Sequence, residues 1–241
     1  DVCSSDLFAL AALLLAAVPQ AAVAQIVVSG PVDGAGIGPG VDIEMDGGTL
    51  FFNTDRVLNT NHVLFAAGTT GTITAAAGKT LEFTGGNLFI MDPASTAVFG
   101  SATATGRVEI NDTFVLPSID GAVVVAGGTL ASNTGAIYDL IFFSDSTTVH
   151  AGATIDLRDA GPFGAIHNLK GAGNVVTAPG SLFQLWGDPG ATTEFSGVIS
   201  GGAELMVMNT GFGPPDSTIV LSGNNTYTGG TTICFCSVLQ L

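Results

Sequence analysis

The densest group of side chains with catalytic potential is a short acidic segment in the second half of the chain. Asp156, Arg158 and Asp159 lie close together, and Asp139 and Asp145 precede them. Stacked parallel strands can bring such carboxylates to one groove, and a pair of carboxylates is the minimum for glycoside hydrolysis. The chain has 20 acidic residues, however, and these would form such a cluster by chance. We therefore expect a solvated outer face and assign no catalytic residue.

Other motifs for catalysis or cofactor binding are incomplete. Gly78 and Lys79 resemble the end of a phosphate-binding loop, but Ile73 stands where its first glycine is required. No Gly-x-Ser-x-Gly elbow of a serine hydrolase occurs. Three histidines stand singly, without the spacing of zinc ligands: His62, His150 and His167. We expect no enzyme activity, no cofactor and no metal.

A second group of interest is aromatic, because aromatic rings can either fill a core or stack on a sugar. Its members are Tyr138, Phe142, Phe143, Phe163 and Trp186. Aromatic side chains bury large areas and dominate core energetics. We therefore expect this group to form part of the core rather than a carbohydrate-binding platform.

The charge balance excludes several classes of partner. The chain has 20 acidic and five basic residues, which gives a formal net charge of −15. Nucleic-acid binders derive their affinity from Lys and Arg on phosphates, and anionic membrane surfaces likewise attract basic segments. With 46% hydrophobic residues, the chain is also too apolar for a disordered acidic tail. We expect no nucleic-acid partner.

The N-terminal segment has the pattern of a secretory signal peptide. Residues 7–17 are an apolar run, too short for a membrane span, which needs about 20 residues. The small-x-small signature Ala22-Val23-Ala24 follows, directly before Gln25. Residues 1–6 (DVCSSD) lack an initiator Met and basic residues. We predict that residues 1–24 are a truncated signal peptide with non-native first residues, cleaved after Ala24.

A loose repeat organises the rest of the chain. A short phrase recurs in which a small residue (lysine at position 79) and a polar residue precede an aliphatic that opens a strand. Its instances are Gly48-Thr49-Leu50, Lys79-Thr80-Leu81, Gly106-Arg107-Val108, Gly128-Thr129-Leu130, Ala153-Thr154-Ile155, Gly180-Ser181-Leu182 and Ala203-Glu204-Leu205. Successive aliphatics lie 22–31 residues apart. Short alternating strands separate them, and we expect corners with positive φ at the glycine pairs 47–48, 85–86, 127–128, 201–202 and 229–230. The pattern predicts an all-β chain over residues 25–241, a right-handed parallel β-helix of about eight coils of roughly 25 residues. A β-sandwich is the alternative.

The C-terminal part resembles a known family. Leu221–Ile233, LSGNNTYTGGTTI, is similar to the autotransporter-associated β-strand repeat of bacterial autotransporter (type V secretion) passenger domains. Phe195–Gly202, FSGVISGG, and Leu169–Gly173 resemble the segment that precedes this motif. The specific match covers roughly residues 166–233, and residues 168–241 are the part most similar to the family.

The resemblance implies a fragment of a β-helical passenger that serves as a structural stalk or adhesin. Such a passenger is exported through the periplasm of a Gram-negative bacterium and carried to the cell surface by a C-terminal outer-membrane β-barrel. Its implied partners are glycans or proteins of host or neighbouring cells, and its only membrane contact is through the barrel, which is missing here. The alternative is a β-helix enzyme that degrades polysaccharides, with Asp156, Arg158 and Asp159 as the first residues to test.

The last repeat departs from the family pattern, and its glycines allow a prediction about stability. Cys234 and Cys236 stand where the family continues with a Gly-Thr-Leu strand. We expect Tyr227 to cover a coil face and the glycine pair 229–230 to form a corner. Replacement of both glycines by valine should then lower the thermal midpoint.

Overall fold

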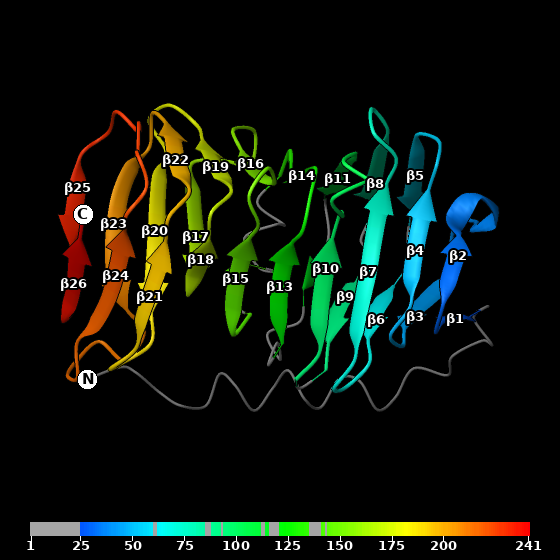
Figure 1. Cartoon of the computed structure of the whole chain (residues 1–241), viewed down its shortest axis with the longest axis horizontal. Coiled ribbons are helices and arrows are strands. Elements are labelled where there is room, and N and C mark those ends of the chain that lie inside the picture. Colours follow the sequence, from blue (N-terminus) through cyan, green and yellow to red (C-terminus); the bar gives the residue numbers. More distant parts are fainter. Residues whose placement is uncertain are drawn as a thin grey trace.

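The chain is a parallel β-solenoid of about eight turns, with successive coils about 23 residues apart. The computed structural model describes residues 25–59, 62–84, 88–92, 94–111, 114–115, 121–134, 141–142 and 144–241. Every strand pairing among these residues is parallel. The strands follow one another along the long axis (Figure 1). The prediction of a parallel β-helix is confirmed, and the β-sandwich alternative is wrong.

Two faces of the solenoid are continuous sheets. The ten-stranded sheet contains β2 Pro31–Asp33, β4 Thr49–Phe52, β7 Thr70–Ala75, β10 Thr96–Phe99, β13 Ala122–Val125, β15 Ser146–Val149, β18 Leu169–Gly171, β21 Thr192–Phe195, β24 Ser217–Leu221 and β26 Ser237–Gln240. The seven-stranded sheet contains β5 Arg56–Asn59, β8 Thr80–Thr84, β11 Arg107–Ile110, β14 Thr129–Ala131, β16 Thr154–Leu157, β19 Asn174–Thr177 and β22 Val198–Gly201.

Two shorter sheets precede the ten-stranded sheet in the order of the coil. One contains β1 Gln25–Val28, β3 Asp42–Met45, β6 Val63–Phe65, β9 Leu88–Met91 and β12 Phe114–Val115. The other contains β17 Phe163–His167, β20 Leu182–Gly187, β23 Glu204–Asn209 and β25 Thr231–Ile233. A 3-10 turn, η1, covers Gly34–Gly36.

The core lies inside the coils and is built from columns of apolar side chains in register. In the ten-stranded sheet, Leu50, Ile73, Phe99 and Val125 occupy equivalent positions on successive strands. All four are at most 1% exposed. Because side chains alternate between the two faces of a strand, the intervening residues point outward.

The repeated phrase identified in the sequence predicts the coil length but not the register. Leu50 lies in the ten-stranded sheet, Leu81 and Ile155 lie in the seven-stranded sheet, and Leu182 lies in the sheet of β17. The instances of the phrase therefore mark corners that are similar in sequence but lead into strands of different sheets. Each corner turns from a small residue into an aliphatic strand, so the three corners of a coil look alike in sequence.

A column of glycines lines the corner that leads out of the ten-stranded sheet. A Cβ atom on Gly197 would lie 1.9 Å from the carbonyl oxygen of Gly173, and one on Gly223 would lie 1.8 Å from that of Gly197. Neighbouring coils therefore approach so closely here that only hydrogen fits between them. Gly197 and Gly223 belong to the FSG and LSG segments that carry the family resemblance.

The predicted Gly-Gly corners are only partly correct. Gly47, Gly128 and Gly201 adopt positive φ angles of 80°, 65° and 106°, as expected for corners. The glycine pair 85–86 lies outside the described residues. At Gly229 a Cβ atom would lie 2.0 Å from the carbonyl oxygen of Ala203, whereas at Gly230 it would meet no atom within 4 Å. The requirement for glycine therefore falls on Gly229 and arises from close approach.

Candidate functional site

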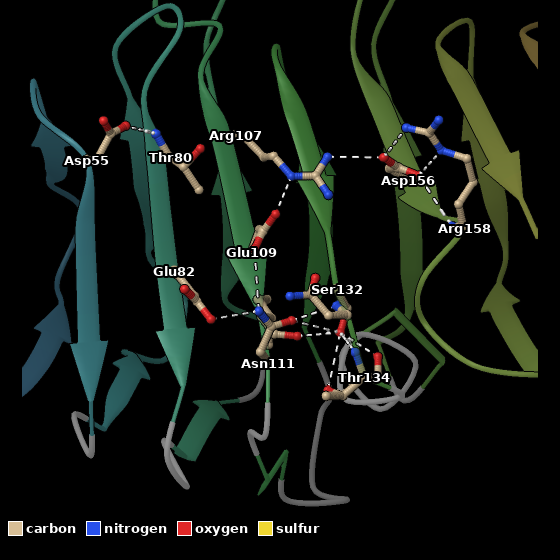
Figure 2. Close-up of polar contacts among 12 residues, drawn as sticks. Asp55, Thr80, Glu82, Arg107, Glu109, Asn111, Ser132, Thr134, Asp156 and Arg158 are labelled. Atoms are coloured by element: carbon tan, nitrogen blue, oxygen red, sulfur yellow. Dashed lines mark hydrogen bonds and ion pairs between the residues drawn. The ribbon is translucent and has the colours of Figure 1, made fainter.

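A polar ladder follows the outer face of the seven-stranded sheet. Glu82 on β8, Glu109 on β11, Ala131 on β14 and Asp156 on β16 occupy equivalent positions on four successive strands. Figure 2 shows their polar contacts across the strands. The alternation that buries their apolar neighbours turns these side chains outward.

Asp156 is the centre of an ion-pair cluster. Its carboxylate accepts hydrogen bonds from Arg158 Nε at 2.9 Å and Nη2 at 2.8 Å, and from Arg107 Nη1 at 3.1 Å. Arg107 also pairs with Glu109 on its own strand. The Arg107 side chain thus reaches past β14 to a strand two positions away (Figure 2). Ala131, whose short side chain lies between Glu109 and Asp156 in register, leaves room for it.

The electrostatics of the cluster stabilise its charged forms. The hydrogen bond from Arg158 is the largest influence and, together with that from Arg107, lowers the pKa of Asp156 to about 2 against the opposing effect of burial. Burial alone would lower the pKa of Arg107, but its bonds to Glu109 and Asp156 outweigh this and raise that pKa. Asp156 is therefore ionised at neutral pH and unsuited to act as a general acid.

The buried side-chain amide of Asn111 joins the two glutamates of the ladder, Glu82 and Glu109. Asn111 Nδ2 donates to Glu82 at 3.0 Å and more weakly to Glu109 at 3.4 Å, so it holds carboxylates from adjacent strands. Asn111 Oδ1 accepts from the backbone N–H of Asn133 at 2.7 Å. Next to Glu82 the surface has a depression of about 270 Å³, lined by Asp55, Arg56, Val57, Thr80 and Glu82.

The predicted acidic constellation is only partly assembled. Asp156 and Arg158 are in contact, as expected, and Asp159 is exposed beside them. Asp139 lies outside the described residues. Asp145 lies at the start of β15, where its carbonyl accepts from Asn168, away from the Asp156 ion pairs. The expected solvated face is wrong for Asp156, which is 4% exposed because arginine side chains cover it.

A second polar cluster links four coils at the corner between β17 and β18. His167 Nε2 lies 2.8 Å from Asp188 Oδ1, and its Nδ1 lies 2.8 Å from the Ser144 carbonyl oxygen. Asn168 donates to Asp188 Oδ2 at 2.7 Å, and Thr210 donates to Asp188 Oδ1 at 3.2 Å. Burial alone would raise the pKa of Asp188, but these hydrogen bonds and the facing His167 hold it below its ordinary value.

The three histidines, which stand singly in the sequence, also lie apart from one another in the structure. His62 is half-exposed, and its Nδ1 lies 3.1 Å from Asp42 Oδ1. His150 is exposed at a corner. Among the described residues, no group of three or more His, Cys, Asp or Glu side chains could hold a metal ion. Cys234 and Cys236 are free thiols.

The expected aromatic core is wrong where the structure describes it. Phe163 is 65% exposed at the start of β17, and Phe142 and Trp186 are only half-buried. Phe142 and Trp186 instead begin a chain of edge-to-face contacts that continues through Phe212 and Phe235, with ring centroids 5.4, 5.7 and 5.2 Å apart. Tyr138 and Phe143 lie outside the described residues. Phe212 and Phe235 lie outside the strands, whereas Phe163 and Trp186 lie on β17 and β20 at positions that are not part of the core.

Several residues of these clusters were not among the candidate site residues predicted from the sequence. They are Glu82, Arg107, Glu109, Asn111, Asp188, Phe212 and Phe235. The strands 81–83 and 108–110 share an aliphatic-Glu-aliphatic pattern, which could have placed Glu82 beside Glu109. No comparable signal marks Phe212 or Phe235, because both lie in irregular corners.

We predict that Asp156→Asn lowers the free energy of unfolding by about 2 kcal/mol at pH 7, since it removes the negative charge that faces both arginines and replaces one of the two acceptor oxygens by an NH2 donor. The folded-state pKa of Asp156 is depressed, so this stabilisation is present above the ordinary pKa of 3.8 and disappears as the pH falls toward about 2. Urea denaturation of both proteins at pH 7, 4 and 2 measures the difference.

Asp159→Asn is the matched control for this prediction, because Asp159 is exposed. Its effect should stay within about 0.5 kcal/mol at each pH. A difference between the wild type and Asp156→Asn that persists undiminished at pH 2 would contradict the assignment.

Comparison with protein-family models, with curated proteins and with solved structures gives no match. Among the residues that the structure describes, no helix is both long and apolar enough to cross a membrane.

Proposed function

We propose that this chain is part of a secreted or surface-displayed passenger of the autotransporter type, in which the solenoid serves as a stalk with an adhesin-like surface. The observation that carries the proposal is the way in which the two motif segments stack. Asn225 Oδ1 accepts from the backbone N–H of Ile199 at 2.8 Å. The N–H groups of Thr226 and Thr228 donate to the carbonyls of Ile199 and Gly201, both at 2.9 Å.

These contacts give the motif a physical role. Its asparagine, its glycines and its backbone bind the preceding coil, and Tyr227 packs against the core as a partly buried side chain. A segment that binds its predecessor in this way adds coils to a stack, which is what an extended stalk requires. The ion pair between Arg107 and Asp156 likewise joins coils, whereas that between Arg158 and Asp156 lies within one coil.

Antibody labelling of the bacterium that encodes the chain tests this proposal. Antibodies against the purified chain should label intact cells, and added protease should remove the label, because a passenger stands outside the outer membrane. An antibody against a periplasmic protein is the control and should label only permeabilised cells. Labelling of this chain that also requires permeabilisation would overturn the proposal.

A polysaccharide-degrading enzyme is the second candidate, favoured by one observation. The Glu82 and Glu109 carboxylates occupy adjacent strands in register, within reach of one amide, and Glu82 lines the 270 Å³ depression. Paired carboxylates are the minimum for glycoside hydrolysis. A reducing-end assay on neutral and acidic polysaccharides tests this candidate. Activity that Glu109→Gln lowers by about 100-fold or more would support it, and activity unchanged in Glu82→Gln and Glu109→Gln would exclude this pair.

A further inference from the structure

A row of aromatic rings runs across several coils on the outside of the solenoid, and its first contact, between Phe142 and Trp186, passes over the coil of β17. Phe142, Trp186, Phe212 and Phe235 contact one another in sequence, each ring edge-on to the next at interplanar angles of 69°, 80° and 80°. We call this set the aromatic row. Phe212 is 60% exposed and Phe235 is 51% exposed. Large apolar side chains that stay this exposed in a continuous row are typical of binding surfaces.

The backbone holds the two exposed rings in an unfavourable conformation. Phe212 has φ 52° and Phe235 has φ 48°, in the left-handed region that bulky residues rarely adopt. Such a conformation is strained and persists only where the surrounding structure enforces it. Strain of this kind at two exposed aromatic residues therefore requires an explanation beyond packing.

A buried amide fixes the positions of both rings. Asn209, which is fully buried, accepts from the backbone N–H of Gly211 at 2.8 Å and donates to the carbonyl of Pro215 at 2.9 Å, so it fixes the loop that carries Phe212. It also donates to the carbonyl of Cys236 at 3.1 Å, next to Phe235. Trp186 is oriented by a 3.0 Å bond from its indole N–H to Gln184. The row is thus rigid before any ligand arrives, which lowers the entropy lost on binding.

The polar surroundings of the row define the chemistry of its ligand. The corner segments 186–190, 208–216 and 233–236 contain no Lys or Arg, which disfavours anionic ligands. Asp188, two residues after Trp186, is bonded by His167, Asn168 and Thr210, yet its side chain is still 46% exposed. Its carboxylate is thus fixed by these donors and remains open to a hydroxyl group. Stacking surface beside fixed hydrogen-bond acceptors suits a neutral polyhydroxylated ligand.

We propose that the aromatic row, with Asp188 at its edge, binds a neutral glycan chain lying along the solenoid. The apolar face of a sugar ring rests against the exposed side chains of Phe212 and Phe235, and sugar hydroxyls donate to the Asp188 carboxylate. This inference rests on the proposed adhesin-like role, for which it names the class of partner. The proline-rich peptides that aromatic grooves also bind are the competing occupant.

Trp186 is the only tryptophan of the chain, so its fluorescence reports directly on the row. The experiment is a fluorescence titration of the purified chain with three neutral probes, cellohexaose, hexa-N-acetylchitohexaose and mannohexaose. We expect a saturable change of the emission with at least one of them, and none with hexagalacturonate or decaproline. The absence of a saturable change with all three neutral probes would overturn the proposal. So would a saturable response to decaproline alone.

Phe212→Gly separates binding from a structural role. Glycine adopts positive φ without strain, so this variant should retain or raise the midpoint of urea denaturation. It should also raise the Kd of the responding glycan about tenfold, the equivalent of 1.4 kcal/mol. Phe235→Gly should behave in the same way, and Phe163→Ala, an exposed phenylalanine outside the row, should leave the Kd unchanged.

Two outcomes of the variant series would show that the row is structural. They are a lowered denaturation midpoint in both glycine variants, and an unchanged Kd in both. Because binding is measured on the purified chain, loss of this inference leaves the surface labelling of cells as an independent test of the proposed function.

Discussion

Replacement of Gly197 by alanine is expected to lower the free energy of unfolding by about 3 kcal/mol. The added Cβ atom would lie 1.9 Å from the carbonyl oxygen of Gly173 and 2.6 Å from the ring of Phe195. Backbone cannot retreat as a flexible side chain can, so the two coils must separate locally. Separation would also disturb Gly223, which lies against Gly197 on the other side.

Urea denaturation of Gly197→Ala measures this effect, with Gly230→Ala as the control. The control adds the same methyl group to a position with no atom within 4 Å and without a left-handed backbone. Its free energy of unfolding should change by less than about 0.5 kcal/mol. Equal losses in the two variants would mean that alanine is unfavourable for reasons other than the close approach of coils.

The second large effect is expected from Phe99→Ala, which should lower the free energy of unfolding by about 3–5 kcal/mol. Phe99 is 1% exposed and lies in register between Ile73 on β7 and Val125 on β13. Truncation leaves a cavity inside one coil, and the hydrogen-bonded strands on either side prevent the coil from collapsing into it.

For this prediction, calorimetry or urea denaturation should be compared with Phe163→Ala, which removes the same atoms from a residue that is 65% exposed. The exposed position should lose less than about 0.5 kcal/mol. A loss at Phe99 as small as that at Phe163 would contradict the assignment of Phe99 to the column of core side chains.

The fold could be predicted because it depends on short-range patterns. Alternation at Leu81-Glu82-Phe83 and Val108-Glu109-Ile110 shows which side chains face inward, and glycines at corners set the coil length. Register could not be read in the same way. Leu50, Leu81 and Leu182 open strands on three different faces after similar small residues, and a loose phrase cannot distinguish them.

The polar clusters depend on that register, so only part of each cluster could be predicted from the sequence. Asp156 and Arg158 are close in sequence and were grouped correctly. Arg107 is 49 residues from Asp156, and its contact requires both the exact pairing of three strands and the short side chain of Ala131 between them. The aromatic row likewise depends on irregular corners, whose conformation is set by Asn209 rather than by a periodic pattern.

The reach of Arg107 past β14 has a mechanical consequence. In a simple stack, each coil is held only by its two neighbours, so tension along the axis can peel coils from an end one at a time. Here Arg107 and Asp156, on the strands to either side of β14, are joined to each other, so separation of β14 from either strand also loads this contact. We therefore expect the coils of β11, β14 and β16 to resist a pulling force better than coils that are joined only to their direct neighbours.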